Sequence, residues 1–144
     1  MEKKQIKKFC SNEIFQVWDH LVSHNYFLLR CAISNTRSEN IDIIFFYTKY
    51  LELPTTLRGL ELVIDHNHST QQQIAERAGI TFDEHLKVFS LKSMEKIFYI
   101  AAYSASIHIN TLPMFDSPLH AMLGIREPEI SKYANHLVSV SVLV

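Results

Sequence analysis

Residues 41–53 read Ile-Asp-Ile-Ile-Phe-Phe-Tyr-Thr-Lys-Tyr-Leu-Glu-Leu, and this stretch decides the kind of fold that the chain can form. It is rich in β-branched and aromatic side chains, which favours a strand. Apolar residues stand on both faces of that strand, because Ile43 and Phe45 alternate with Ile44 and Phe46. A strand of this type is typical of the centre of a sheet that is covered on both sides. We therefore expect a layered structure built around a sheet.

Three further segments carry strand patterns. Residues 26–33 alternate apolar side chains with Arg30 on the opposite face, and residues 60–65 alternate in the same way. Because a turn around Pro54 separates residues 41–53 from residues 60–65, we expect those two strands to form a hairpin. Residues 97–109 give the longest alternating pattern of the chain.

Residues 86–91 are ambiguous, because a short apolar run suits either a strand or a helix. As a strand, this segment would pair antiparallel with residues 97–109 through a turn at Ser93 and Met94. As a helix, it would directly follow the helix expected over residues 70–78. The choice bears directly on function, as described below.

Helical patterns accompany these strands. Over residues 11–24 the apolar side chains recur at the spacing of one helix face. A second helix is expected over residues 70–78, begun by Ser69 or Thr70 and ended by Gly79 in a left-handed conformation. The remaining expectations are short helices over residues 117–124 and 127–137 and a covered or paired strand over residues 138–144.

Together these elements predict an α+β fold in a single domain that spans residues 1–144. We expect a mainly antiparallel sheet of about five or six strands, with an N-terminal amphipathic helix, a middle helix and short C-terminal helices. A chain of 144 residues buries enough surface to hold a core without disulfides or metals.

The composition excludes several classes of protein. The net charge is −1, so the chain as a whole does not attract nucleic acid. Only three glycines occur, and neither a phosphate-binding loop nor a dinucleotide fingerprint is present, so we do not expect a nucleotide-dependent enzyme. Cys10 and Cys31 belong to no metal or disulfide motif. Because no stretch approaches the ~20 apolar residues needed to span a bilayer, we expect a cytoplasmic protein that makes no membrane contact.

Residues 65–70, Asp-His-Asn-His-Ser-Thr, resemble the start of the metal-binding motif of ββα-metal nucleases, as found in phage recombination endonucleases. The expected order of strand 41–53, strand 60–65 and helix 70–78 is also the order of a ββα unit. The zinc-binding cysteines of that endonuclease family are not present in this chain.

The nuclease resemblance implies a divalent metal ion and a set of residues that would use it. Asp65 would bind the metal, and His68 and His85 are further candidate ligands. His66 would act as the general base, the one candidate catalytic residue. The alternative is a polar turn that ends a strand and begins a helix, with both neighbouring histidines in solvent.

Residues 73–81, Gln-Ile-Ala-Glu-Arg-Ala-Gly-Ile-Thr, resemble the first helix and turn of bacterial helix-turn-helix proteins. Ala75 is small enough to let two helices cross closely, and Gly79 suits the tight turn. The resemblance implies a DNA-binding regulator that uses residues 70–91. His85 stands where such a motif has an apolar core residue. The alternative is an ordinary capped helix that ends at a glycine.

Since no complete catalytic or cofactor site emerges, the leading hypothesis is a small non-catalytic protein that binds a partner without a cofactor. We expect the partner to be a protein, with nucleic acid as an alternative. Tyr99 and Tyr103 on the long strand are candidate contact residues. Strand edges also offer a route to a homo-oligomer.

One observation separates the three hypotheses. A helix over residues 86–91 favours the DNA-binding regulator, whereas convergence of His66 and His85 on a metal favours the nuclease. A strand over residues 86–91 with separate histidines favours the binding protein.

Overall fold

The computed structural model describes residues 2–144 and consists of one ten-stranded mixed sheet with three helices. The prediction of an α+β fold with five or six strands is therefore wrong, because the sheet is about twice that size and dominates the chain. The strands are β1 (Lys3–Ile6), β2 (Lys8–Leu21), β3 (Tyr26–Cys31), β4 (Asn40–Phe46), β5 (Tyr50–Glu52), β6 (Thr56–Asp65), β7 (Lys87–Ser93), β8 (Lys96–Ala102), β9 (Ser104–Asn110) and β10 (Leu137–Leu143). The helices are α1 (His68–Ala78), α2 (Leu119–Met122) and α3 (Glu127–His136).

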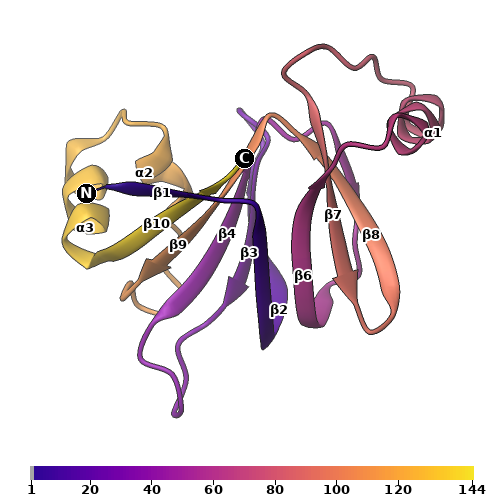
Figure 1. The fold of residues 1–144 in the computed structure, drawn as a ribbon. Helices are drawn as coiled ribbons and strands as arrows, with labels where there is room; N and C mark the ends of the chain where they lie inside the picture. The colour runs from indigo at the N-terminus through magenta and orange to yellow at the C-terminus, as the bar shows by residue number, and fades with distance from the viewer. Residues whose placement is uncertain (1) are drawn as a thin grey trace.

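The order across the sheet is β1-β10-β9-β4-β3-β2-β6-β7-β8-β5. Every pair of neighbours is antiparallel except β1 and β10. The sheet turns at β2 and β6, which divides it into a six-strand half that begins with β1 and a four-strand half that ends with β5 (Figure 1). Helices α2 and α3 lie beside the six-strand half, and α1 lies beside the four-strand half.

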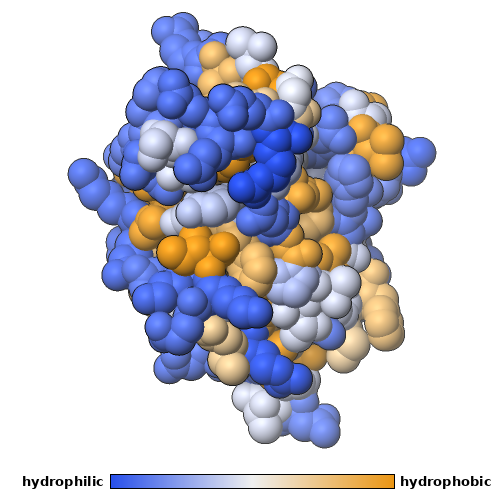
Figure 2. Space-filling model, turned by 90° about the vertical axis from the view of Figure 1, so that its right-hand side faces the viewer, coloured by the Kyte–Doolittle hydropathy of each residue, from blue (hydrophilic) through white to orange (hydrophobic). Residues whose placement is uncertain are grey.

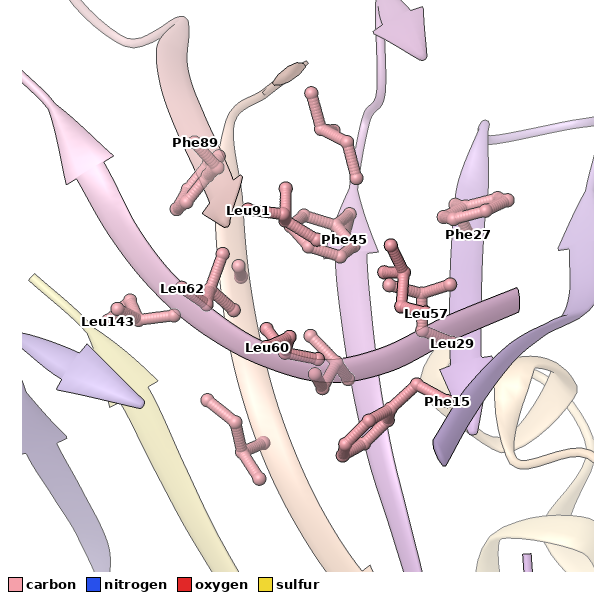
Figure 3. Packing of buried hydrophobic residues seen from close by; sticks show 14 of the residues in the cluster. Phe15, Phe27, Leu29, Phe45, Leu57, Leu60, Leu62, Phe89, Leu91 and Leu143 are labelled. Carbon is pink, nitrogen blue, oxygen red and sulfur yellow. The ribbon is translucent and has the colours of Figure 1, made fainter. Parts of the chain in front are cut away.

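The main hydrophobic core fills the space between the two halves of the sheet (Figure 3). Phe45 of β4 and Phe89 of β7 contact each other edge to face, with ring centroids 5.6 Å apart, although their strands are not neighbours in the sheet. Leu29, Leu62 and Leu91 are fully buried in the same cluster. The folding of the sheet onto itself therefore explains how so large a sheet buries its inner face.

Two segments cross from one half of the sheet to the other, and both were expected to be single strands. Residues 41–53 are divided at Tyr47, whose positive φ of 52° ends β4 before the chain reaches β5. Residues 97–109 are divided at Tyr103, whose amide donates to the carbonyl oxygen of Phe46 at 3.0 Å. The predicted hairpin of residues 41–53 with residues 60–65 is wrong, since β4 pairs with β3 and β9 while β6 pairs with β2 and β7.

The predicted N-terminal helix is also wrong, because residues 8–21 form β2. The pairing of β2 with β6 shifts register between Ser11 and Ile14, and its pairing with β3 shifts between Val17 and Asp19. Each irregularity moves the following side chains out of the two-residue alternation. The resulting spacing of apolar residues imitates the period of a helix, which explains the error.

Residues 86–91, for which strand and helix were both left open, lie largely in strand β7. This strand pairs antiparallel with β8 through a turn at Met94 and Glu95, one residue after the turn expected at Ser93 and Met94. Two other predictions are confirmed. Helix α1 ends at Gly79 in the left-handed conformation, although Asn67 rather than Ser69 or Thr70 accepts the hydrogen bond at its start. The C-terminal valine strand is paired on both sides, with β9 and with β1.

The face that carries α1 and β8 shows patches of hydrophobic side chains among hydrophilic ones (Figure 2). Leu51 of β5 and Ile97 of β8 are exposed in this half of the sheet. Scattered exposure of this kind is ordinary for a protein surface.

Among residues 2–144, no helix has both the length and the apolar character required to cross a membrane.

Candidate functional site

The segment that resembles nuclease and DNA-binding motifs forms an open pocket of about 400 Å³ at the start of α1. Its lining residues include Asp65, His66, His68, Asp83 and Lys87. The Oδ1 atom of Asp65 accepts the backbone amide of Asn67 at 2.8 Å, so this carboxylate supports the turn.

The pocket does not assemble the ligand set that the nuclease resemblance implies. The Nε2 atom of His85 lies 3.2 Å from the carboxylate of Glu84, and both side chains are exposed. Within residues 2–144, no group of three or more His, Cys, Asp and Glu side chains is placed to hold a metal ion. The strand pair of a ββα unit is also not formed, as the pairing of β6 shows.

The helix-turn-helix resemblance ends at Gly79. Residues 80–86 contain no helix, and Lys87–Ser93 form strand β7. Asp83 accepts the backbone amides of His85 and Leu86, and these two hydrogen bonds hold its pKa below the ordinary value. The second helix that would read DNA is therefore replaced by a turn and a strand.

Tyr99 and Tyr103 lie against the small cluster that packs α1 on the sheet, and both are partly buried. The hydroxyl of Tyr103 donates to Asp83 at 3.3 Å, and its ring lies 5.9 Å from that of Tyr47. Strands β8 and β10 are each paired on both sides, β8 with β7 and β5, and β10 with β9 and β1. These tyrosines thus have packing roles within the fold.

A different site, which the sequence analysis did not identify, lies on the outer face of the six-strand half. Arg30 of β3 and Asp42 of β4 occupy opposite positions on neighbouring strands, and both are fully buried. Arg30 donates from Nε and Nη2 to the two carboxylate oxygens of Asp42, at 2.6 and 2.8 Å. A paired geometry with two parallel bonds is the form in which a buried ion pair is best tolerated.

The third nitrogen of Arg30, Nη1, holds the loop that follows β9. This loop comprises residues 111–118, and we call it the Phe115 loop. Nη1 donates to the carbonyl oxygens of Met114 and Asp116, both at 2.8 Å. These two carbonyls stand on either side of Phe115. The buried guanidinium therefore fixes the backbone on both sides of one side chain.

Two buried asparagines complete this network. Asn110 donates to Asp42 at 2.8 Å and accepts from Asn40 at 2.9 Å. Asn40 also donates to the carbonyl oxygen of Leu112, at 2.9 Å, at the base of the Phe115 loop. Because each buried polar group has a partner, the network avoids the cost of unpaired donors and acceptors.

The side chain that this network positions is exposed. Phe115 has 85% of its surface in solvent, the largest exposed fraction among the large hydrophobic residues described. Its ring stacks on Trp18, with centroids 6.4 Å apart and planes 18° from parallel. Trp18 in turn lies over the guanidinium of Arg30, whose Cζ is 5.6 Å from the ring centroid. A buried cation thus supports two stacked aromatic rings, and the outer one faces solvent.

A pocket of about 280 Å³ opens beside Phe115, between the Phe115 loop and helices α2 and α3, and we call it the loop pocket. Leu112, Phe115 and Pro118 supply apolar walls. The charged lining residues are Asp116, Glu129 and Lys132, of which Lys132 and Asp116 form an ion pair. An exposed aromatic ring next to a small pocket is an arrangement suited to contact with another molecule.

A second polar chain ties α3 to the sheet beneath the loop pocket. The Nε2 atom of His108 lies 2.7 Å from the hydroxyl of Ser106, and its Nδ1 atom lies 2.5 Å from the hydroxyl of Tyr133 on α3. Burial, followed by the charge of Lys3, lowers the pKa of His108 from 6.5 to about 4. Burial likewise raises the pKa of Tyr133, so that its hydroxyl stays protonated.

We expect acid to destabilise the fold through His108. Because the folded state binds this proton less readily than the unfolded chain, the contribution to stability is complete above pH 6.5 and is lost as the pH falls toward about 4. A difference of this size corresponds to at most ~3 kcal/mol. Urea unfolding across this pH range measures it, with His108→Gln as the comparison. An equally steep pH dependence in the variant would contradict this assignment.

A signal for the Arg30 network was present in the sequence. Asp42 and Arg30 each interrupt a strand that is otherwise apolar, and a strand covered on both sides cannot leave such a charge unpaired. Asn40 and Asn110 gave no comparable signal, because both stand at strand ends.

Comparison of the chain with protein-family models, curated proteins and solved structures finds no match to any of them.

Proposed function

We propose that this chain is a non-catalytic protein that binds a protein partner through the Phe115 loop and the loop pocket beside it. The observation that carries the proposal is that Phe115 is 85% exposed while the backbone on both sides of it is held by Arg30. Holding an exposed aromatic ring in place does not bury it, so the constraint contributes little to the stability of the fold. A ring that is already held in place loses little conformational entropy when a partner covers it, and this favours the affinity of the complex.

The chemistry of the surface favours a protein over nucleic acid. Aromatic anchors next to small pockets are typical of the energetic centres of protein interfaces. Both carboxylates of the loop pocket are ion-paired, Asp116 with Lys132 and Glu129 with Arg126, so the pocket offers no concentration of positive charge for a phosphate backbone. Cys10 and Cys31 are free thiols, which is compatible with the cytoplasmic location that the sequence predicts.

Comparative capture from the source cells tests the proposal. The wild-type chain and the variant Phe115→Asp are immobilised separately, and the retained proteins are quantified. Met94→Asp is the matched control, because Met94 is 72% exposed on the β7–β8 turn, in the other half of the sheet. We expect at least one protein that wild type and Met94→Asp retain equally and that Phe115→Asp loses.

Folding must be unchanged for this comparison to be decisive. Because Phe115 is largely in solvent, its replacement should change the free energy of unfolding by no more than about 0.5 kcal/mol. Capture profiles that are the same for all three proteins would contradict the proposal.

A further inference from the structure

We infer that a second pocket, on the outer face of the six-strand half, binds a small monocarboxylate with an apolar body. This pocket lies around Ser106 and His108 of β9, has a volume of about 270 Å³, and is called the Ser106 pocket below. It shares no lining residue with the loop pocket. Three features carry the inference: a buried hydroxyl proton without an acceptor, a lysine without an ion pair, and apolar walls.

The pairing of the strands brings the polar lining residues together. Lys3 of β1 stands opposite Val140 of β10, and Val140 stands opposite His108. Two positions along the same strands, Val142 stands opposite Ser106. Directly paired residues share a face of the sheet, as do residues two positions apart on one strand. All five side chains therefore lie on one face, where each of them lines the pocket.

The hydrogen bonds of His108 have a defined direction. The imidazole is neutral near pH 7, because burial above all lowers its pKa to about 4, so it carries a single proton. The hydroxyl of Tyr133 stays protonated, and among residues 2–144 its one hydrogen bond is to Nδ1 of His108, at 2.5 Å. Tyr133 therefore donates to Nδ1, which places the imidazole proton on Nε2.

This direction leaves a free donor at Ser106. Nε2 of His108 donates to the hydroxyl oxygen of Ser106 at 2.7 Å, and that hydroxyl has no other hydrogen bond to residues 2–144. Its own proton thus has no acceptor, although Ser106 is only 5% exposed. A buried donor in this state is costly, and an acceptor from outside the chain would relieve the cost. Because His108 donates to Ser106, the imidazole does not activate this serine as a nucleophile.

The ammonium of Lys3 is the second group without a partner. Lys3 is exposed at the mouth of the pocket, and the ion pairs formed among residues 2–144 do not include it. Its charge is, after burial, the second cause of the low pKa of His108, so the ammonium lies near the imidazole. A cation and a hydroxyl donor suit the two oxygens of a carboxylate. One cation balances one negative charge, which favours a monocarboxylate over a phosphate dianion.

The walls of the pocket suit an apolar ligand body. Phe46 of β4, which pairs with Ser104 of β9, lines the end away from Lys3, and Met122 of α2 also contributes. An apolar pocket with a few convergent polar groups is the usual form of a small-molecule site. The volume of about 270 Å³ lies just below the range of roughly 300–1,000 Å³ that is usual for drug-sized ligands. The ligand is therefore a small acid, with a body the size of one aromatic ring or a short branched chain.

A titration with benzoate tests this inference, with benzamide as the uncharged probe of the same shape. Each probe is added near pH 7 to isotope-labelled protein and is followed by amide chemical shifts. We expect millimolar binding of benzoate, with shifts centred on residues 104–108 and 139–142. Benzamide should bind at least about tenfold more weakly, because it lacks the negative charge.

Three variants assign the effect to the two groups without partners. Lys3→Gln should weaken benzoate binding by at least about fivefold and leave benzamide binding unchanged. Lys4→Gln is the matched control, because Lys4 is the next residue of β1, is equally exposed and points to the other face of the sheet. Ser106→Ala should weaken benzoate binding by about tenfold.

Lys3→Gln decides the outcome, because it changes an exposed side chain and leaves the buried hydrogen bonds of His108 intact. Benzoate binding that is weakened by Lys3→Gln and kept by Lys4→Gln would support the inference. Absence of shifts around the pocket, equal binding of benzamide, or equal effects of Lys3→Gln and Lys4→Gln would each overturn it.

Discussion

Replacing Arg30 by methionine is expected to lower the free energy of unfolding by about 3–5 kcal/mol. The reason is that Asp42 would remain fully buried with its charge uncompensated. The carbonyl oxygens of Met114 and Asp116 would lose their shared donor in the same step. Urea unfolding followed by the fluorescence of Trp18, the single tryptophan, measures the change.

The double variant Arg30→Met/Asp42→Leu separates the ion pair from the loop. Because both charges are removed, most of the lost stability should return, apart from the cost of leaving Asn110 without its acceptor. The Phe115 loop would still lack its two hydrogen bonds and would become mobile. A double variant as unstable as Arg30→Met would show that the charge pair is not the main source of the effect.

Replacing Phe45 by alanine is expected to cost a similar amount, about 3–5 kcal/mol. Phe45 is fully buried where the two halves of the sheet meet, and its ring contacts that of Phe89. Its removal would leave a cavity between the two halves of the sheet, which the neighbouring side chains can fill only in part. Thermal and urea unfolding of Phe45→Ala provide the measurement.

Ile97 offers a control for Phe45 within the same sheet, because it is apolar but half exposed on the outer side of β8. Ile97→Ala should change stability by no more than about 1 kcal/mol. Equal losses in the two variants would mean that the core does not lie between the two halves.

The elements that could be predicted from the sequence were those whose signals are local. Gly79 ends α1 because few other residues adopt its left-handed conformation without strain. Residues 86–91 were left open between strand and helix, but the antiparallel pairing with β8 that was expected for a strand depends on a turn nearby in the chain. These features depend on near neighbours in the chain.

The features that could not be predicted depend on contacts between distant segments. Strand β2 reads as a helix because its two register shifts are fixed by β3 and β6, which no local pattern reveals. The breaks at Tyr47 and Tyr103 follow from the folding of the sheet onto itself. A register shift of one residue moves every following side chain to the other face of the sheet. A missed shift therefore changes which side chains are predicted to be buried.

The candidate site escaped prediction for the same reason. Arg30 and Phe115 are 85 positions apart, and their relation appears only when the Phe115 loop folds back over β3. The residues that resemble nuclease and helix-turn-helix motifs, 65–70 and 73–81, form the start of a capped helix and its end, and a turn and strand β7 follow them.

The affinity of the captured partner for Phe115→Ala, measured by calorimetry with purified proteins, tests the central claim most directly. We expect the dissociation constant to rise by about 30-fold or more relative to wild type, as for a residue at the energetic centre of an interface. The double variant Arg30→Met/Asp42→Leu should also bind more weakly while remaining folded, and Met94→Asp should bind as wild type does. A dissociation constant that is unchanged in Phe115→Ala would contradict the account.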